Sequence, residues 1–209
     1  VPVIETGSGN CHVYVDASAD LEAAVDIIVN AKTQRVGVCN AAETLLVHTD
    51  VAATYLPAAA RALWDKDTVL HADPAAHRIL AEAATAGGGE ALLMEATEAD
   101  WGTEYGSLDL AVRVVGTLEE AIDHIRAHTT GHTEAVLAQD VSVINDFIAG
   151  MDSAAVMVNA STRFTDGGQL GLGAELGIST QKLHARGPMG VSELTTTTWI
   201  VEGDGHIRP

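Results

Sequence analysis

Apolar residues recur along most of the chain with two spacings, one typical of strands and one typical of helices. Short apolar runs predict strands, and apolar stripes at helical spacing, opened by Ser, Asp or Thr, predict helices with one buried face. The expected strands cover residues 12–15, 44–48, 68–70, 108–115, 133–138 and 154–158. The expected helices cover residues 20–31, 50–66 and 74–84, and two more follow Thr117 and Asp140. Strands that alternate with helices predict an α/β domain with a largely parallel sheet.

Three segments depart from this alternation. The glycines at 87–89 predict a loop after the helix over 74–84. Residues 164–191 are rich in glycine and have little periodicity, and loops of that length usually carry function. The threonine-rich stretch 194–201 ends in Trp199, Ile200 and Val201 and predicts an exposed strand that needs a partner.

Charge and cysteine content limit the classes of partner. The formal net charge of −18 argues against nucleic acid and against anionic membranes. Two cysteines make no disulfide framework, which favours a reducing cytoplasm, and no apolar run approaches the ~20 residues that span a bilayer. The chain opens with Val1 and Pro2 rather than with methionine, which suggests a piece of a longer parent.

One of the two cysteines, Cys39, follows a glycine and precedes a predicted strand. We expect its thiol to lie in a short turn whose backbone N–H groups, with Lys32 and Arg35 nearby, favour the thiolate and therefore a nucleophile. The alternative is that Cys39 is a small buried apolar residue, as most free cysteines are.

Three stretches carry a family resemblance: residues 30–43 around Cys39, the segment Glu5-Thr6-Gly7-Ser8-Gly9-Asn10-Cys11-His12, and residues 164–190. Together they resemble γ-glutamyl phosphate reductase, a member of the aldehyde dehydrogenase superfamily. The resemblance implies a three-layer aldehyde-dehydrogenase-type catalytic domain with a mostly parallel sheet and a C-terminal oligomerisation strand. It further implies that residues 1–37 end the cofactor-binding lobe, that residues 38–190 form the catalytic domain, and that residues 191–209 form the oligomerisation tail. Most of the NADPH lobe would then lie outside this chain.

The reaction that this resemblance implies is the reduction of L-glutamyl 5-phosphate to L-glutamate 5-semialdehyde and phosphate in proline biosynthesis, with NADPH as cofactor. In the resembled family a cysteine, here Cys39, takes the acyl group as a thioester and NADPH delivers a hydride to it. The backbone N–H of Asn40 or of Cys39 would stabilise the oxyanion, although Asn40 is equally well explained as a turn residue. One departure is that Val36 and Gly37 stand where the family would have Pro-Ser.

Two glutamates have counterparts in the superfamily. Glu5 precedes Cys39 by 34 residues, which is the spacing of the glutamate that activates the deacylating water in general aldehyde dehydrogenases. A reductase that acts on an acyl phosphate activates no water, so Glu5 is a candidate proton handler, or simply a solvated glutamate. Glu104, in Thr103-Glu104-Tyr105-Gly106, matches the glutamate that binds the nicotinamide ribose hydroxyls.

Two further groups are candidates for substrate binding. One follows the last predicted strand, where α/β sites collect their ligands, and would anchor the substrate α-carboxylate; its members are Asn159, Ser161, Thr162 and Arg163. The other places three cationic side chains at alternate positions, which predicts an anion site if the segment is extended, or salt bridges to nearby acids: Lys182, His184 and Arg186. His124, His128 and His132 lack a convincing fourth ligand, so no metal site is expected.

The first interpretation is therefore the catalytic lobe of an NADPH-dependent acyl-phosphate reductase, forming a homo-oligomer in the cytoplasm. Glutamate 5-kinase is a candidate partner or fusion partner. The alternatives are an aldehyde dehydrogenase that hydrolyses its thioester, and a non-catalytic lobe that only assembles with a longer partner.

Overall fold

The computed structural model of the chain describes residues 3–87 and 92–209. Residues 88–91 are outside this description, and they include most of the loop expected at 87–89. The main body holds seven strands: β1 (Cys11–Val15), β2 (Ala42–His48), β3 (Val69–Ala72), β4 (Leu93–Glu95), β5 (Asp109–Val115), β6 (Thr133–Leu137) and β7 (Ala155–Val158). Its helices are α1 (Leu21–Thr33), α2 (Thr49–Trp64), α3 (Pro74–Gly87), α4 (Leu118–His128) and α5 (Val141–Gly150).

The seven strands form one sheet in the order β4-β3-β5-β2-β1-β6-β7, and every neighbouring pair is parallel. The expected α/β fold with a parallel sheet is confirmed. Strands covered on both faces are buried along their whole length, and this holds for β1 and β6. The short strand β4 was not predicted, because three residues with mixed exposure carry no pattern.

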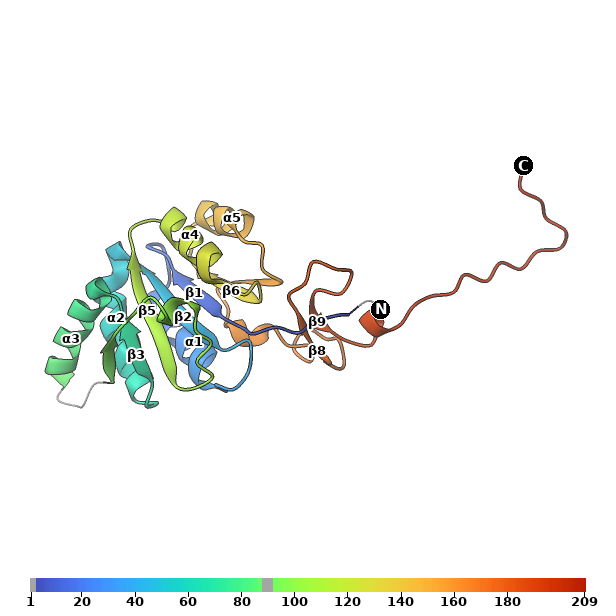
Figure 1. Cartoon of the computed structure of the whole chain (residues 1–209). Helices are drawn as coiled ribbons and strands as arrows, with labels where there is room; N and C mark the ends of the chain where they lie inside the picture. Colours follow the sequence, from blue (N-terminus) through green and yellow to red (C-terminus); the bar gives the residue numbers. More distant parts are fainter. Residues whose placement is uncertain (1–2, 88–91) are drawn as a thin grey trace.

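Helices cover both faces of the sheet, so the body has three layers (Figure 1). On one face α1, α2 and α3 pack through small and branched side chains, with Ile28, Leu56 and Leu80 fully buried against the strands. On the other face α4 and α5 pack through Ile125 and Phe147 against Tyr14 of β1. Ile148 of α5 is 44% exposed.

The domain boundary expected at residue 37 falls inside this sheet. Strand β1 pairs with β2 on one side and with β6 on the other, so it lies within the sheet rather than in a separate lobe. Helix α1 packs on α2 and on the same strands. Residues 11–33 are therefore part of the same folded unit as residues 42–158.

Capping residues explain where several helices begin. Asp20 accepts from the backbone N–H of Ala23, and Thr117 accepts from that of Glu120, as expected. The Glu120 carboxylate accepts from the N–H of Gly116, which closes a variant of the expected capping box. Helix α2 begins at Thr49, one residue before the expected range, and the His48 side chain caps it.

A small lobe and a tail extend from the body (Figure 1). The lobe holds the antiparallel strands β8 (Gly177–Ser179) and β9 (Gly187–Met189), and Thr6 bridges to Ser179. Three short 3-10 turns, η1 (Asp100–Gly102), η2 (Thr162–Phe164) and η3 (Ser192–Leu194), complete the described elements.

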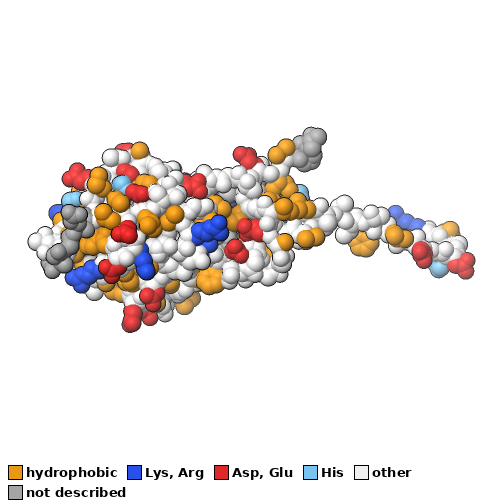
Figure 2. Space-filling view, turned by 90° about the horizontal axis from the view of Figure 1, so that it is seen from below, with side chains coloured by type: hydrophobic (Ala, Val, Ile, Leu, Met, Phe, Trp, Pro, Cys, Tyr) orange, Lys and Arg blue, Asp and Glu red, His pale blue; other side chains and the backbone are white. Residues whose placement is uncertain are grey.

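The residues after η3 run outward as a single chain, and apolar side chains lie along it uncovered on the face that Figure 2 shows. Trp199 and Val201 are each 91% exposed. The strand expected over 194–201 does not form here, because no described segment pairs with it. None of the helices in residues 3–87 and 92–209 is long and apolar enough to cross a membrane.

Candidate active site

Cys39 lies in a tight turn immediately before β2. The N–H of Ala41 donates to the carbonyl of Val38 at 3.0 Å, so Cys39 and Asn40 occupy the two central positions of the turn. Cys39 is half-buried, whereas the other cysteine, Cys11, is fully buried. The predicted nucleophile is therefore the accessible one of the two.

Both carbonyl oxygens of the central turn residues are held from outside the turn. The Cys11 thiol of β1 donates to the Cys39 oxygen at 3.2 Å, and the Thr162 hydroxyl of η2 donates to the Asn40 oxygen at 2.6 Å. The Asn40 side-chain N–H donates to the Thr165 carbonyl at 2.9 Å. The Asn40 amide thus joins the turn to the segment after β7, and only its backbone N–H remains as a candidate oxyanion donor.

Charged side chains around the Cys39 sulfur set its acidity. Burial raises the pKa of the Cys39 thiol, and the carboxylates of Glu175 and Glu104 raise it further. The backbone N–H of Cys39 itself and the Arg163 guanidinium act in the opposite direction. The expectation of a resting thiolate is wrong, because desolvation and two carboxylates outweigh one guanidinium.

Lys32, which was expected to favour the thiolate, is committed elsewhere. Its ammonium pairs with Glu43 at 2.5 Å, and both side chains are almost fully excluded from solvent. The second Glu43 oxygen accepts from the N–H of Gly106 at 3.4 Å, and the Lys32 ammonium lies 5.8 Å from the centre of the Tyr105 ring. This pair therefore connects the two ends of the Cys39 segment to the loop that carries Glu104.

Arg163 lies on the other side of the turn, next to the end of α1. Its Nε donates to the side-chain oxygen of Gln34 at 2.8 Å. A cavity of about 300 Å³ lies against it, lined by Asn30, Gln34, Arg163, Phe164, Asp166 and Gln169. The guanidinium is thus held at the rim of a small hollow, and its charge acts on the Cys39 thiol.

The site forms at the amino ends of the strands, not at the carboxyl ends where the position of residues 159–163 had been expected to place it. Asn159 remains at the carboxyl end, where its side chain bonds both the N–H and the carbonyl of Ala138. The chain then returns along the sheet, so that Thr162 contacts the Cys39 turn and Arg163 contacts Gln34 after α1. The hydroxyl of Ser161 accepts from the N–H of Arg163, and Asn159 is not brought to the site.

The remaining candidates lie apart from this cluster. Glu5 is exposed, and its backbone N–H donates to Gln181 in the small lobe. Residues 181–186 bend rather than extend, so the three cations do not share one face. Lys182 and Arg186 both contact Asp152, whereas exposed His184 acts on Glu193. The structure therefore favours the salt-bridge alternative for this segment.

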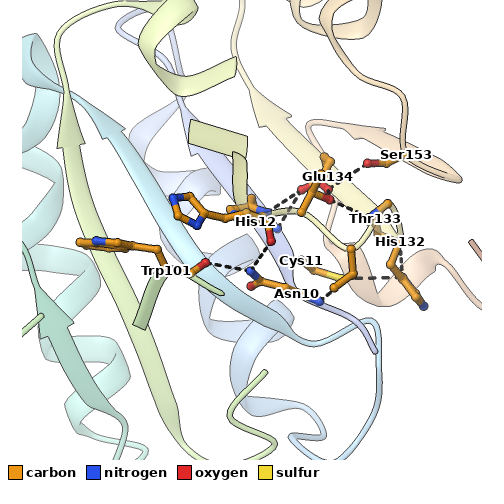
Figure 3. Close-up of polar contacts among 12 residues, drawn as sticks. Asn10, Cys11, His12, Trp101, His132, Thr133, Glu134 and Ser153 are labelled. Carbon is orange, nitrogen blue, oxygen red and sulfur yellow. Dashed lines mark hydrogen bonds and ion pairs between the residues drawn. The ribbon is translucent and has the colours of Figure 1, made fainter. Parts of the chain in front are cut away.

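A buried polar network lies beneath the turn, at the starts of β1 and β6 (Figure 3). Glu134 accepts from the backbone N–H of His12 at 3.1 Å and contacts the His12 ring at 2.9 Å, and its other oxygen accepts from Ser153 at 2.9 Å. Asn10 donates to the carbonyl oxygens of Trp101 and His128. No group of three potential metal ligands is found among the described residues.

Several residues of the site carried no sequence signal of their own. Gly9 lies directly against the backbone of Cys39. Four other residues contribute to the site only through contacts or charges from segments far apart in the chain: Cys11, Gln34, Thr165 and Glu175. Only the run Asn10-Cys11-His12, which has three polar or reactive side chains at the start of a buried strand, marks part of this set.

Solved structures of low identity show the fold class. A crystal structure of an acetylating aldehyde dehydrogenase from Geobacillus thermoglucosidasius matches the whole chain and 53% of its own, with a TM-score of 0.73 and 20% identity. The domain, with a half-buried cysteine turn at the amino ends of its parallel strands, thus has the fold of an aldehyde-dehydrogenase-type catalytic domain. No family model matches the chain.

Relatives of higher identity place it more closely. γ-Glutamyl phosphate reductases from Kineococcus radiotolerans and Bifidobacterium longum subsp. infantis are 61% and 59% identical over 208 residues. A crystal structure of the Thermotoga maritima γ-glutamyl phosphate reductase matches the whole chain with a TM-score of 0.90 and 49% identity, over 48% of its own length. In sequence the chain is similar to γ-glutamyl phosphate reductases, and it spans about half the length of the curated relatives it matches (47% and 48%).

Proposed function

We propose that the chain supplies the nucleophile-bearing part of a γ-glutamyl phosphate reductase, which converts L-glutamyl 5-phosphate to L-glutamate 5-semialdehyde and phosphate in proline biosynthesis. The observation that carries the proposal is the arrangement at Cys39. An accessible thiol lies in a fixed turn, with Arg163 on one side and Glu104 on the other acting on its sulfur. The strong similarity to reductases of this name supports the same assignment.

Cys39 performs the covalent step. Its half-exposed thiol loses a proton to solvent, and the thiolate attacks the acyl carbon of the acyl phosphate. The bond from that carbon to the phosphate oxygen breaks, phosphate leaves with the bonding electrons, and a thioester to Cys39 remains. A backbone N–H at residues 39–40 stabilises the oxyanion formed on the way.

Reduction of the thioester needs a hydride, which a bound NADPH would supply. Glu104 fits such a group, because its carboxylate is exposed, is close enough to act on the Cys39 sulfur, and is a natural acceptor for the two hydroxyls of a ribose. Its loop is fixed by the contact between Gly106 and Glu43.

Arg163 is the substrate anchor in this proposal. A guanidinium offers a planar pair of donors to a carboxylate, and Arg163 both lines a small cavity and acts on the Cys39 thiol through its charge. Ser161 and Thr162 support it through the backbone, since the Ser161 hydroxyl caps η2 and the Thr162 hydroxyl holds the turn. Lys182, His184 and Arg186 remain candidates for the phosphate only if the contacts to Asp152 are exchanged for substrate contacts.

The covalent step is testable on this chain alone. Incubation with acetyl phosphate, a small acyl phosphate, should add one acetyl group to Cys39, detected by mass spectrometry, with release of phosphate. Cys39→Ser should abolish thioester formation, while Thr68→Val, which removes a fully buried hydroxyl without a hydrogen-bond partner, should not. Acylation elsewhere with an unmodified Cys39 would refute the assignment of the nucleophile.

The complete activity is tested on the natural gene product that contains this sequence. Oxidation of glutamate semialdehyde with NADP⁺ should require phosphate, because the thioester is cleaved by phosphate in that direction. Acid formation without phosphate would instead support the hydrolytic aldehyde dehydrogenase. A preference for NADP over NAD in the same assay tests the cofactor assignment.

Assembly into a homo-oligomer in the cytoplasm, with glutamate 5-kinase as a possible partner, completes the proposal. The exposed apolar side chains of the tail, Trp199, Ile200, Val201 and Ile207, support self-association. Removal of residues 195–209 should lower the number of subunits per particle, obtained from the molar mass by light scattering. The helical signal in circular dichroism should be unchanged. An unchanged number of subunits would exclude the tail as the oligomer contact.

A further inference from the structure

The peptide unit that joins Cys39 to Asn40 is fixed by residues that precede and begin β1. The Cys11 thiol donates to the Cys39 carbonyl oxygen at 3.2 Å, and the Cys11 side chain is fully buried. Gly9 lies directly against the same carbonyl, since a Cβ built on Gly9 would come within 1.7 Å of the oxygen. The carbonyl therefore points into a space that only glycine leaves open, toward a donor on the neighbouring strand.

Fixing this carbonyl also fixes the direction of an N–H group. In a planar trans peptide, the C=O of one residue and the N–H of the next point in opposite directions. No cis peptide occurs among the described residues. Because the Cys39 carbonyl points toward β1, the Asn40 N–H points away from it, and none of the described backbone or side-chain groups accepts from that N–H.

The Cys39 carbonyl is the nearer of two acceptors within reach of the Cys11 proton. The ring Nδ1 of His132 lies 3.7 Å from the Cys11 sulfur, but it is only 2.8 Å from the Thr133 hydroxyl. That hydroxyl also bonds the Thr165 hydroxyl at 2.9 Å, which ties the three side chains together. The Cys39 carbonyl, at 3.2 Å, is therefore the better placed acceptor for the thiol, and Figure 3 shows Cys11 with His132 and Thr133.

Burial keeps this donor in its protonated form. Desolvation raises the pKa of the Cys11 thiol well above its ordinary value, and the charge of Glu134 adds to the effect. Cys11 is thus an S–H donor and not a second nucleophile, which distinguishes it from Cys39.

We propose that Cys11 is a positioning residue for acyl transfer: it holds the Cys39–Asn40 peptide so that the Asn40 N–H is directed at the oxyanion of an acyl group on Cys39. This inference rests on the proposed function, since it assumes that Cys39 is acylated. It assigns to the segment from Gly9 to Cys11 a role in the chemistry of a turn 28 residues further along the chain.

Two reagents separate this role from a merely structural one. Acylation of Cys39 by p-nitrophenyl acetate passes through an oxyanion, whereas alkylation by iodoacetamide is a direct displacement that forms none. Removing the thiol with Cys11→Ala should slow acylation by about tenfold, a fraction of what a lost oxyanion donor costs, and should change alkylation by less than about twofold. Cys11→Ser keeps a donor and should restore most of the acylation rate. Thr68→Val is the matched control for loss of a buried polar atom.

The outcomes are distinguishable. If Cys11→Ala lowers both rates equally, or neither, the positioning role is refuted although Cys39 remains the nucleophile. If the unmodified chain is alkylated at Cys39 but never acylated there, the proposed function itself fails. Urea unfolding checks that the variants are folded, and Cys11→Val, which fills the space without a donor, replaces Cys11→Ala if that variant does not fold.

Discussion

Lys32 and Glu43 form an ion pair at 2.5 Å with side chains 0% and 1% exposed, and the segment between them carries Cys39. Burial lowers the pKa of Lys32 and raises that of Glu43, and each charge opposes the shift of the other. Two charges withdrawn from water are stable only as a pair, because either one alone would keep the full cost of desolvation.

Loss of one partner should therefore destabilise the fold strongly. We expect Glu43→Gln or Lys32→Met to lower the free energy of unfolding by about 3–5 kcal/mol, and the double variant to lose less than the sum of the two. Urea unfolding of the four proteins measures this coupling. Lys182→Met is the control, because Lys182 and Asp152 are both well exposed and such pairs contribute about 0–1 kcal/mol. Additive losses would show that the pair has no special role.

The glycines at 7 and 9 offer a matched pair of substitutions. A Cβ at Gly9 would overlap the Cys39 carbonyl, whereas a Cβ at Gly7 would meet only the Thr180 hydroxyl, at an ordinary 3.5 Å. Gly9→Ala should displace the turn and thereby change the rate at which Cys39 is alkylated. It should also lower the free energy of unfolding by about 2 kcal/mol or more. Gly7→Ala should change neither quantity by much. Equal effects at both positions would contradict the close approach.

The layers of the fold were predictable because they depend on local periodicity. The stripes of α1, α4 and α5 and the apolar runs of β1, β2 and β5 record burial directly in the sequence, and the caps Asp20 and Thr117 mark the helix starts. The order of the strands in the sheet was not expected in detail, since it depends on contacts between distant segments.

The site was predictable only where a residue type carries the chemistry by itself. Cys39 stands out as a thiol, but the acidity of its sulfur depends on Glu175 and Glu104, which are 136 and 65 residues away in the chain. Lys32 is near Cys39 in sequence and yet turned toward Glu43. Proximity along the chain thus predicted the wrong direction for the pKa shift of the Cys39 thiol, because the charges that matter come from other loops.

Two buried histidines should make the fold sensitive to acid. Burial lowers the pKa of His124 to about 3 and that of His132 to about 4. Arg113 donates to the His124 ring at 3.1 Å, which also favours a neutral imidazole. In the unfolded chain both titrate near 6.5, so between pH 4 and 6.5 the unfolded state binds more protons than the folded state.

Their contribution to stability is therefore complete above about pH 7 and is lost as the pH falls below about 6.5. Each histidine should contribute a slope approaching about 1.4 kcal/mol per pH unit near pH 5. Urea unfolding between pH 4.5 and 7.5 measures the slope, and His132→Gln should reduce it while the exposed His184→Gln should not. A stability that is flat over this range would contradict the neutral, buried state.

The raised pKa of Cys39 gives the last prediction, in which two substitutions should shift this pKa in opposite directions. Glu175 raises the pKa of the thiol and Arg163 lowers it, so Glu175→Gln should increase the thiolate fraction near pH 7 and Arg163→Ala should decrease it. We expect the rate of alkylation by iodoacetamide to rise about two- to fivefold in Glu175→Gln and to fall by a similar factor in Arg163→Ala. The reason is that only the thiolate reacts. The rate is measured against pH by mass spectrometry, which gives the pKa as the midpoint. Glu193→Gln, an exposed carboxylate of the same lobe that does not act on Cys39, is the control. If the rates changed while the midpoint stayed the same, a change in access to the sulfur rather than in its charge environment would explain them.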